Sequence, residues 1–590
     1  MKLFDKTVFT YSVVCSDDII IFAMMNTETL GVRYYEISKY TKEDELKNII
    51  SSLCCNGVYW CTYNGRFHDE TILNYCTINY KQLQSTPRNE LAWVINNFCD
   101  RIHSQPIADW INYKHAYKFA SFDLSPIFYN RGYVEFEDAK LSLNFNDVAV
   151  RIPDKSLCAT SKRQQMRYIA YKNISEYTSI LKAKTKDVLF REYVTKTIGV
   201  NVMNNNITTI GSKLLNAFYE NLTGKSIGEI NNHYTGIPLA EIIPVDYQLG
   251  HNDFLESLRK IVITPDYNLN LPLFDYNSTL TFGGIKSSCQ RGITRNNGCH
   301  IYHIDIKSAW PTALVNFKLA PNGVGVDGFV GAVKHIIHLK ETTHYRDEFK
   351  RALNSVIGNL MTEDSKLHDY KSFISIKILS ALETISLIES LDFIDIIQIN
   401  NDGIVFTSNE DYESIKGTIS DWEVKHNAKT TLIEYDLFCQ YSLNDWFAHY
   451  DNTTVCKGIF LAGSTKYPLA STSAVILSII DDMNPTNAML RVEKHLFILG
   501  EKAGENEEFF IEKNDRMVCI GKRVRYYYVK DGISLYKKNI NGGNVKKIKE
   551  HIALIGCTMD DLYYPWYTKK AFDLYNELKV TQLSLFNDEI

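Results

Sequence analysis

Two hydrophobic periods alternate in the first third of the chain, and together they predict a layered α/β domain. Residues 7–15 and 18–25 are rich in β-branched and aromatic side chains and are separated by a short polar segment, which predicts a β-hairpin. Residues 43–53 repeat apolar positions with the helical period, and 57–62 match a buried strand. Long helices are predicted at 164–184 and across 186–199.

The pattern changes further along, and it predicts a mixed α+β body. Short apolar strands are expected at 300–306, 395–400 and 403–406, and a polar turn joins the last two. A Gly-Gly pair within 279–288 predicts a turn between extended segments. Helices are expected at 344–360, 373–391 and 568–578.

Composition limits the class of protein. A chain of 590 residues is too long for one hydrophobic core, so three or more domains are expected. No segment has the roughly 18 apolar residues of a membrane span, and the N-terminus does not resemble a signal peptide, so we expect a cytosolic protein. The 13 cysteines include no CxxC pair, which predicts reduced thiols and no zinc site. The net charge is −5, so a nucleic-acid binder would have to concentrate its cations locally.

Three short segments combine residue types that suit phosphoryl transfer. Residues 302–312 form an apolar strand ending at Asp305, followed by Ser308 at the expected start of a helix whose free N–H groups suit a triphosphate. A helix at 344–360 places Arg346, Lys350, Asn354 and Gly358 four residues apart, on one face. Each segment also has an ordinary interpretation, as a capped helix or a solvated helix face.

The third segment is a hairpin whose polar turn projects Asp402 between residues 396 and 406. Alone it also matches a common Asx-Gly turn. In this order, however, the three segments resemble motifs A, B and C of family B DNA polymerases. Motif A (D-x-x-S-L-Y-P-S) aligns with Asp305, Ser308 and residues 310–312, motif B (K-x-x-x-N-S-x-Y-G) with residues 350–358, and motif C (D-T-D-S) with residues 400–403. The chain departs from these motifs at Trp310, Ile357, Asn400 and Gly403.

The resemblance implies a template-directed DNA polymerase with a two-metal mechanism. Asp305, Ile306 and Asp402 are the implied metal ligands. Two Mg²⁺ ions are expected there, and Mn²⁺ could substitute for them. The implied nucleotide-binding residues are Ile306, Ser308, Trp310, Arg346, Lys350 and Asn354. A bulky ring at Trp310 would collide with a 2′-hydroxyl and so favour deoxynucleoside triphosphates.

Further segments resemble parts of bacteriophage members of the family that contact primer-template DNA. The residues concerned are Gly283, Gly284, Gly358, Lys457, Gly458 and Arg525. The implied fold is α+β and multidomain, a right hand of palm, fingers and thumb preceded by an α/β ribonuclease H-like exonuclease-type domain. The expected division is 1–185 exonuclease-like, 186–317 connector and first palm part, 318–365 fingers, 366–460 palm, 461–578 thumb and 579–590 tail.

The exonuclease-like domain is expected to be inactive. Residues 63–69 resemble its second motif and provide Asp69, but Ser12 and Val14 stand where the first motif needs carboxylates, and Ser175 stands where the third needs Asp. One carboxylate cannot hold two metals. A register shift to Asp17, Asp18 or Glu176 is the alternative.

The last residues resemble the peptide that binds the bacterial sliding clamp. Its implied anchors are Gln582, Leu583, Leu585 and Phe586. The alternative is an apolar end folded onto the thumb. A clamp motif implies a phage or prophage enzyme in a bacterial cytoplasm, with the clamp as partner and no membrane association. Two rival functions remain, a protein-primed polymerase, whose insertions after motifs A or B are not seen, and a non-catalytic, clamp-tethered DNA-binding protein.

Overall fold

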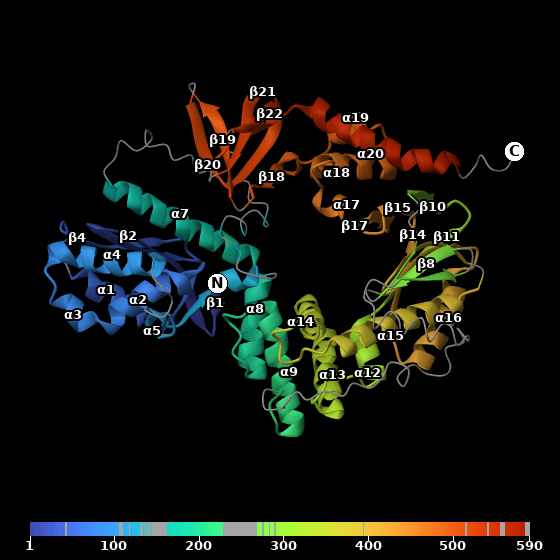
Figure 1. The fold of residues 1–590 in the computed structure, drawn as a ribbon, viewed down its shortest axis with the longest axis horizontal. Helices are drawn as coiled ribbons and strands as arrows, with labels where there is room; N and C mark the ends of the chain where they lie inside the picture. Colours follow the sequence, from blue (N-terminus) through green and yellow to red (C-terminus); the bar gives the residue numbers. More distant parts are fainter. Residues whose placement is uncertain are drawn as a thin grey trace. The chain divides into compact units, whose positions relative to one another are not determined.

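The chain folds into two compact units of mixed α/β structure. The computed structural model describes residues 1–41, 44–104, 110–116, 118–129, 134, 136, 139, 143, 162–227, 268–273, 276–281, 284–287, 291–392, 394–504, 506–513, 516–539, 542–554 and 561–584. The first unit comprises Met1–Leu214 and Thr343–Ala352, and the second comprises Leu215–Thr342 and Leu353–Ile590. The expectation of a multidomain chain with helices and sheets is therefore confirmed, and each unit is described by itself (Figure 1).

A six-stranded sheet forms the centre of the first unit. Its path is β4-β3-β2-β5-β6, with β1 paired to β2. The strands β2, β3 and β4 are antiparallel, whereas β5 is parallel to β2 and β6 is parallel to β5. The predicted hairpin and strand are confirmed. The bounds are β1 (Lys2–Leu3), β2 (Lys6–Ser16), β3 (Ile19–Asn26), β4 (Val32–Ser38), β5 (Val58–Thr62) and β6 (Ser121–Asp123).

Strand β3 is buried on both faces because its alternate side chains enter two different cores. Ile20, Phe22 and Met24 pack into the larger core with Trp60 and the helices α1 (Glu45–Leu53), α2 (Asp69–Ile78) and α4 (Arg88–Ser104). On the other face Ile19, Ile21, Ala23 and Met25 pack against Met166, Ala170 and Ile174 of α7 (Lys162–Ala183). The sheet thus carries helices on both sides. Two shorter helices complete this region, α3 (Tyr80–Gln84) and α5 (Ile111–Lys114).

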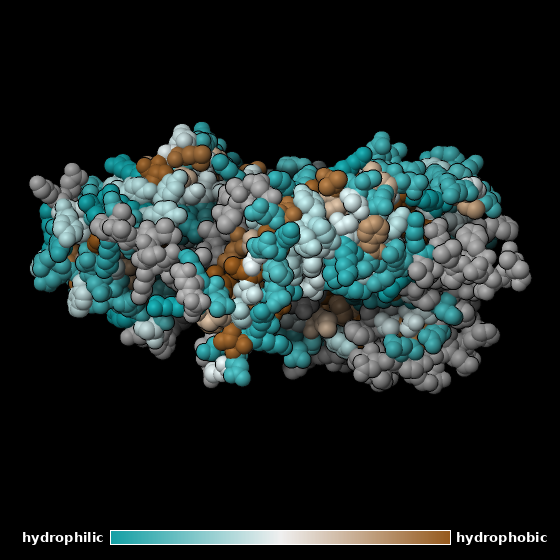
Figure 2. Space-filling view, turned by 90° about the horizontal axis from the view of Figure 1, so that it is seen from above, coloured by the Kyte–Doolittle hydropathy of each residue, from teal (hydrophilic) through white to brown (hydrophobic). Residues whose placement is uncertain are grey.

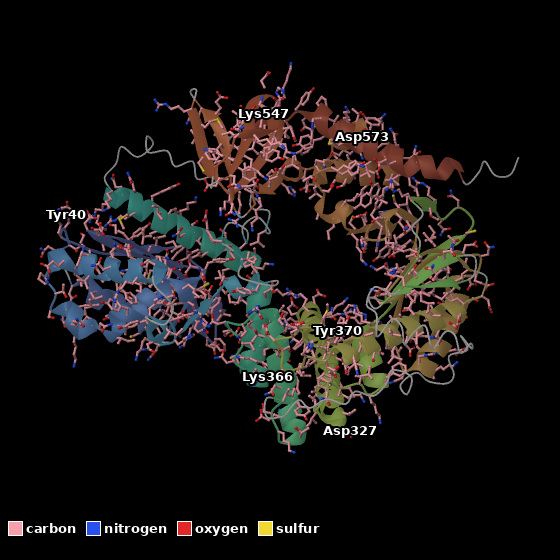
Figure 3. All side chains as sticks on the ribbon, in the orientation of Figure 1. Tyr40, Asp327, Lys366, Tyr370, Lys547 and Asp573 are labelled. Carbon is pink, nitrogen blue, oxygen red and sulfur yellow. The ribbon has the colours of Figure 1, made fainter. Side chains whose placement is uncertain are left out.

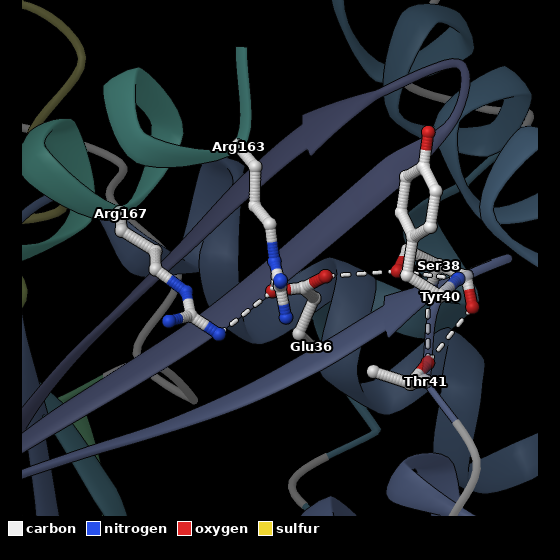
Figure 4. Close-up of polar contacts among 6 residues, drawn as sticks. All are labelled: Glu36, Ser38, Tyr40, Thr41, Arg163 and Arg167. Carbon is white, nitrogen blue, oxygen red and sulfur yellow. Dashed lines mark hydrogen bonds and ion pairs between the residues drawn. The ribbon is translucent and has the colours of Figure 1, made fainter. Parts of the chain in front are cut away.

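A buried carboxylate holds helix α7 on the edge of this sheet. Glu36 on β4 is 3% exposed and accepts hydrogen bonds from Arg163 Nε at 2.7 Å and Arg167 Nη2 at 2.9 Å, both from α7 (Figure 4). The Ser38 hydroxyl donates to its second oxygen at 2.8 Å. Burial raises the pKa of Glu36, but the two arginines and Ser38 outweigh that effect and hold its pKa below the ordinary value.

The helices after α7 confirm the predicted helical stretch. They are α8 (Thr185–Tyr193), a single π-helical turn (Val194–Ile198) and α9 (Ile207–Thr223), which begins in the first unit and ends in the second. Phe190 of α8 packs edge-on against Phe349, which lies in the Thr343–Ala352 segment of the first unit. The first half of helix α14 (Arg346–Asn359) is therefore anchored to α8.

A four-stranded antiparallel sheet dominates the middle of the second unit. Its order is β12-β13-β11-β14, with bounds Ile394–Asn400, Gly403–Ser408, His300–Ile306 and Thr430–Tyr435. The predicted strands at 300–306, 395–400 and 403–406 are confirmed. Helix α15 (Tyr370–Glu389) is buried along almost its whole length, and α12 (Ala309–Asn316) and α16 (Tyr412–His426) pack against it. The predicted helix at 373–391 is thus confirmed, whereas α13 (Val326–Thr342) was not predicted.

Two further sheets are formed by strands that precede and follow those of the central sheet in the chain. The expected Gly-Gly hairpin is found between β8 (Tyr276–Thr281) and β9 (Gly284–Ser287), which follow β7 (Leu269–Leu273). Strand β10 (Gly292–Arg295) joins β15 (Leu437–Ser442), β16 (Asp445–Tyr450) and β17 (Thr453–Lys457).

The C-terminal part combines a helical core with a twisted sheet. Tyr567 of α20 (Tyr564–Ser584) is fully buried, accepts from Tyr528 N and donates to Phe497 O at 2.8 Å. The predicted helix at 568–578 is confirmed but extends further in both directions. The other elements are α17 (Ile459–Ala462), α18 (Leu469–Ile480), α19 (Pro485–Met489), β18 (Leu499–Lys502), β19 (Glu507–Lys513), β20 (Arg516–Gly521), β21 (Arg523–Asn539) and β22 (Lys546–Leu554). Figure 3 marks Lys547 on β22 and Asp573 on α20.

None of the described helices combines the length and apolar content that a membrane span requires. The face drawn in Figure 2 is mainly hydrophilic where the chain is described, with apolar side chains in a few small groups.

The Glu36 cluster gives an asymmetric prediction for stability. Glu36→Gln should destabilise the first unit by about 1–3 kcal/mol because charge-assisted hydrogen bonds are lost. Arg163→Met with Arg167→Met should cost more, about 3–5 kcal/mol, because an unpaired carboxylate stays buried. Hydrogen exchange of β4 and α7 amides under denaturant measures both. Equal costs for the two changes would contradict this account.

The pH dependence of the same cluster has a definite sign. The folded-state pKa of Glu36 lies below its ordinary value of 4.5, so its contribution to stability is present above that pH. It is lost as the pH falls through the lower, folded-state pKa. Glu36→Gln should remove this part of the acid sensitivity, and Asp395→Asn, an exposed carboxylate in the second unit, is the control.

Candidate active site

Two carboxylates from distant parts of the chain meet at one end of the central sheet. Strands β11 and β13 pair antiparallel, and the register sets Asp305 opposite Gly403, the residue after Asp402. The Ile306 N–H donates to Asp402 O at 2.7 Å, so the strand end and the turn are held together by the backbone. Asp305 is half-buried and Asp402 is exposed. The expectation that these residues lie on neighbouring strands is confirmed.

Gly403 allows this close approach because it has no side chain. A Cβ at this position would lie 2.6 Å from Ile304 O and 3.5 Å from Asp305 Oδ1. The Asp305 carboxylate therefore lies directly over the Gly403 backbone, one residue from Asp402. Motif C of the family has Ser at this position, and the β11–β13 spacing gives a steric reason for glycine here.

The third residue of interest in this turn is Asn400, where the family has Asp. Its side-chain amide donates to Gln398 Oε1 at 3.3 Å, and Gln398 in turn donates to Leu443 O at 2.8 Å. Asn400 thus belongs to a hydrogen-bonded chain along β12. This arrangement uses an amide donor, which a carboxylate could not supply.

The face of the sheet that carries Asp305 also carries aromatic and basic groups. His303 lies two residues before Asp305 and is within 2.8 Å of the Tyr435 hydroxyl. Burial, with a smaller effect of Lys457, lowers the pKa of His303 to about 4, so this imidazole is neutral at physiological pH. Lys457 is exposed, and its ammonium lies 4.9 Å from the centre of the Trp446 ring. The predicted Lys457 therefore lies near the sheet face that carries Asp305.

The glycine after Lys457 is required by its surroundings. Gly458 has φ +59°, and a Cβ there would lie 2.0 Å from Asp445 Oδ1 and 2.3 Å from Asn444 O. The Asp445 carboxylate accepts from Ile459 N at 2.9 Å and so fixes the start of α17. Lys457 and Gly458 thus form a rigid exit from β17.

Ser308 occupies the predicted N-cap position of α12 but does not cap the helix with its hydroxyl. Its backbone is left-handed (φ 53°, ψ 45°), and its hydroxyl makes no hydrogen bond to the helix N-terminus. The hydroxyl instead accepts a hydrogen bond from Lys340 of α13, a lysine that is only 4% exposed. The capping expectation was wrong, because a cation from α13 competes for the same oxygen. Left-handed backbone at a non-glycine residue costs about 1–2 kcal/mol and is concentrated at functional sites.

Trp310 follows two residues after Ser308, and a second buried lysine lies against its ring. The Lys377 ammonium of α15 lies 3.3 Å from the centre of the Trp310 ring, and Lys377 is 8% exposed. Burial lowers the pKa of Lys377 to about 8, Asp402 opposes this effect, and Lys286 adds to it. A cation on one face of the ring holds Trp310 in place and lies within the field of Asp402.

Sequence reasoning missed Lys340 and Lys377 because each lies in an apolar helix without a motif. Lys377 stands within the run Ile374–Ile378, which reads as core. No local signal marked either lysine beforehand, because both helices carry other charged residues, among them Lys334 in α13 and Glu383 in α15.

Strand β9, at the Gly-Gly segment, lies against the Asp402 turn, and the expected DNA contact of this segment stays a prediction. Gly284 has φ +114°, and a Cβ there would lie 2.4 Å from Asn401 Oδ1. The Ser287 hydroxyl of β9 accepts from Ile399 N at 2.9 Å, which fixes β9 against β12. Gly283 lies outside the described residues.

The prediction that four residues spaced by four lie along one face of α14 is confirmed. Arg346, Lys350, Asn354 and Gly358 are all exposed, whereas Ile357, at the position of the family's Tyr, is 1% exposed. Arg346 and Lys350 belong to the first unit, and Asn354 and Gly358 belong to the second. Contact between the two cations and a triphosphate at Asp305 stays a prediction.

Arg525 belongs to a different sheet from the one that carries Asp305. Arg525 is in β21, opposite Gly500 of β18, and is 6% exposed, which leaves its proposed DNA contact without direct support. Gln582 and Leu583 fall within the last turn of α20, so their backbone is helical. Leu585 and Phe586 lie outside the described residues.

The first unit places the remaining exonuclease-type carboxylate in a dry, hydrogen-bonded position. Asp69 is 3% exposed and accepts from Val13 N and Thr62 Oγ1, both at 2.8 Å. Burial raises the pKa of Asp69. Ser12, at the place of a first-motif carboxylate, accepts from Asn173 Nδ2 of α7 at 3.1 Å. Asp123, which sequence reasoning missed, is 2% exposed and accepts from Asn64 N and Ser125 N.

The three alternative carboxylates of this unit are engaged elsewhere. Asp18 pairs with Lys162 at 2.5 Å, and Glu176 lies 3.8 Å from Lys172 on its own helix. Asp17 accepts from Asn96 Nδ2 at 2.9 Å.

Comparison with known proteins gives a distant relation in structure only. No protein-family model and no curated protein sequence matches the chain. Among solved structures, the chain is similar to the family B DNA polymerase of the hyperthermophilic archaeon Pyrobaculum calidifontis, with a TM-score of 0.45 and 12% identity over 98% of this chain and 78% of that chain. At this level of similarity, function has to be argued from the chain's own geometry.

The contact between Gly284 and Asn401 gives a prediction with an internal control. Gly298 also has positive φ (+96°), but a Cβ there meets nothing within 4 Å. Gly298→Ala should therefore cost only backbone strain, about 1–2 kcal/mol. Gly284→Ala should cost about 1–3 kcal/mol more through overpacking against Asn401.

Hydrogen exchange of β9 and β12 amides under denaturant measures the difference. Gly284→Ala combined with Asn401→Ala should recover the overpacking part and leave the strain. The close approach of β9 to the turn would be disproved by equal costs for the two glycines.

Proposed function

We propose that this chain is a template-directed DNA polymerase that adds deoxynucleotides to a primer 3′-hydroxyl. The single observation that carries the proposal is the β11–β13 register, which brings Asp305 and Asp402 together at one sheet end. The motif order adds the triphosphate-binding and base-pair-facing residues on α14. These features belong to separate elements, and a common function explains why they occur in one chain.

The residues present fit a pair of divalent metal ions. Carboxylate and backbone oxygens at Asp305, Ile306 and Asp402 are hard donors, which Mg²⁺ prefers. Gly403 leaves the space beside Asp305 Oδ1 free of a side chain. Bound there, the metal ions supply activation of the primer hydroxyl and charge neutralisation at the leaving pyrophosphate.

The chain's own cations have distinct proposed roles around this site. Arg346 and Lys350 bind the triphosphate, and Asn354 lines the nascent base pair. Lys340 holds the Ser308 hydroxyl at the start of α12, where backbone N–H groups face phosphate oxygens. Lys377 supports the Trp310 ring from behind, and that ring excludes a 2′-hydroxyl.

Primer-template DNA is proposed to contact Gly283, Gly284, Gly358, Lys457, Gly458 and Arg525. Lys457, Gly458 and Gly358 are exposed, which supports their proposed contact with DNA in particular. The clamp-binding role of Gln582, Leu583, Leu585 and Phe586, and with it a phage or prophage origin in a bacterial cytoplasm, rests on the sequence resemblance alone.

We also propose that the first unit is an exonuclease-like domain without effective proofreading. Its strand order, with three antiparallel strands followed by two parallel ones, supports a ribonuclease H-like arrangement. Ser12 and Asn173 hydrogen-bond where a metal ligand is needed, and Asp69 is bonded to the backbone.

The two rival functions differ in their support. Short connections between helices argue against protein priming, since only residues 317–325 separate α12 from α13 and only 360–369 separate α14 from α15. A non-catalytic DNA-binding protein draws its support from Asn400, whose amide is engaged in hydrogen bonding where the family has a carboxylate. Extension activity separates this rival from the polymerase.

Primer extension with Mg²⁺ tests the central proposal. Asp305→Asn and Asp402→Asn should each lower the extension rate by about 10³-fold, equivalent to about 4 kcal/mol of transition-state stabilisation. Asp395→Asn, an exposed carboxylate at the other end of β12, is the matched control and should extend normally. Retained extension in both active-site variants would refute the assignment, and no extension by the parent chain would favour the non-catalytic rival.

The same assay also tests the proposed loss of exonuclease activity and the proposed binding to a sliding clamp. Without nucleotides, the labelled primer should stay intact, and shortening abolished by Asp69→Ala would show an active exonuclease. Addition of a bacterial sliding clamp should lengthen products of the parent chain and leave those of a chain truncated before Gln582 unchanged.

Discrimination between ribo- and deoxynucleotides tests the Trp310–Lys377 pair. Lys377→Met should reduce the preference for deoxynucleotides by about 2- to 30-fold, the equivalent of a cation–π contribution of about 0.5–2 kcal/mol. Trp310→Ala should reduce it further, and Lys334→Met, an exposed lysine of α13, should leave it unchanged. An unaltered preference in Trp310→Ala would remove the ring from sugar selection.

A further inference from the structure

Three side chains of metal-binding type converge in the first unit, and one of them directly precedes Asp69. His68 precedes α2, and Cys99 and His103 lie one turn apart on α4. The ligand atoms of these three residues lie within 4.8 Å of one another. Cys15, on β2, packs against the same hydrophobic core that contains Cys99.

We propose that His68, Cys99 and His103, together with Cys15, bind one divalent cation of the zinc class. Two imidazoles and two sulfurs form a donor set that selects Zn²⁺ over Mg²⁺ or Ca²⁺. The set was not predicted, because its members come from three separate elements and lack the short CxxC spacing. Only the i, i+4 pair Cys99 and His103 carries a local signal, since both point from the same face of α4.

The distances suit a metal after a small side-chain adjustment. Tetrahedral Zn–S and Zn–N bonds place neighbouring ligand atoms about 3.3–3.8 Å apart. His68 Nδ1 lies 3.9 Å from Cys99 Sγ, and the His68 and His103 rings are 5.1 Å apart between centres. Rotation of exposed His103 brings the third ligand in without movement of the backbone.

The surroundings of Cys99 favour metal binding over an inert thiol. Cys99 is 6% exposed, and its sulfur lies 3.9 Å from His68 Nδ1, within a group of three ligand atoms that all lie within 4.8 Å of one another. A sulfur beside two imidazoles has the neighbours of a metal ligand rather than those of an isolated core thiol. Exposed His103 leaves the cluster reachable from solvent.

The bound ion would have a structural role. It would join the C-terminal part of α4 to the end of β2 and to the start of α2, where His68 directly precedes Asp69. Its binding free energy would add to the stability of the unit.

Metal titration of the full chain tests the site. After chelator treatment under reducing conditions, the chain should take up one equivalent of Zn²⁺, and Co²⁺ should give visible absorption and a thiolate charge-transfer band. Zn²⁺ should raise the unfolding temperature of the first unit. His103→Asn, at an exposed position that leaves the core intact, should weaken binding by about 100-fold or more, whereas His115→Asn, another exposed histidine of this unit, should not.

Cys99→Ser supplies a second variant and should abolish the charge-transfer band, with exposed Cys54→Ser as its control. Three outcomes would overturn the proposal: uptake well below one equivalent, equal weakening by His103→Asn and His115→Asn, or a Cys15–Cys99 disulfide in freshly lysed cells. The measurements do not depend on primer extension, so they stand apart from the proposed polymerase activity.

Discussion

The pairing of β11 with β13 is the constraint on which the proposed chemistry depends. An antiparallel register fixes which residues face each other, and a slip of one residue would turn Asp305 to the opposite face of the sheet. Several contacts prevent such a slip. Tyr302, Ile304 and Ile306 are buried on one face, and His303 is bonded to Tyr435 on the other. The apolar core of the sheet therefore determines the position of the carboxylate.

Placing two carboxylates at one sheet end creates an electrostatic cost that the surrounding lysines offset. Lys377 is buried against Trp310 and is stabilised in its charged form by Asp402, although burial lowers its pKa to about 8. Lys340 is similarly buried and bonded to Ser308. Buried lysines are unfavourable unless they have such partners. Lys377 therefore interacts both with Asp402 and with Trp310 of α12, and Lys340 holds Ser308, the residue directly before that helix.

The sequence predicted these elements well where a local pattern determined them. The hairpin of β2 and β3, the strands β11, β12 and β13, and the helices α7, α14 and α15 follow from hydrophobic period, and Asp305 and Asp402 follow from motif order. The sequence could not predict contacts set by long-range packing. Nothing local to Ser308 indicates that Lys340 takes its hydroxyl, and nothing local to Trp310 indicates Lys377. Asp123 and the His68–Cys99–His103 cluster were missed for the same reason.

The two units treat their carboxylates in opposite ways, and this contrast bears on function. Asp69 is almost fully buried, its oxygens accept from Val13 N and Thr62, and burial raises its pKa, so the group serves the fold. Asp402 is exposed at a turn whose backbone is held by Ile306 N. A turn held so firmly, with its carboxylate left in solvent, contributes little to packing. Under the proposed polymerase function, this exposed carboxylate and its neighbour Asp305 would together hold divalent metal.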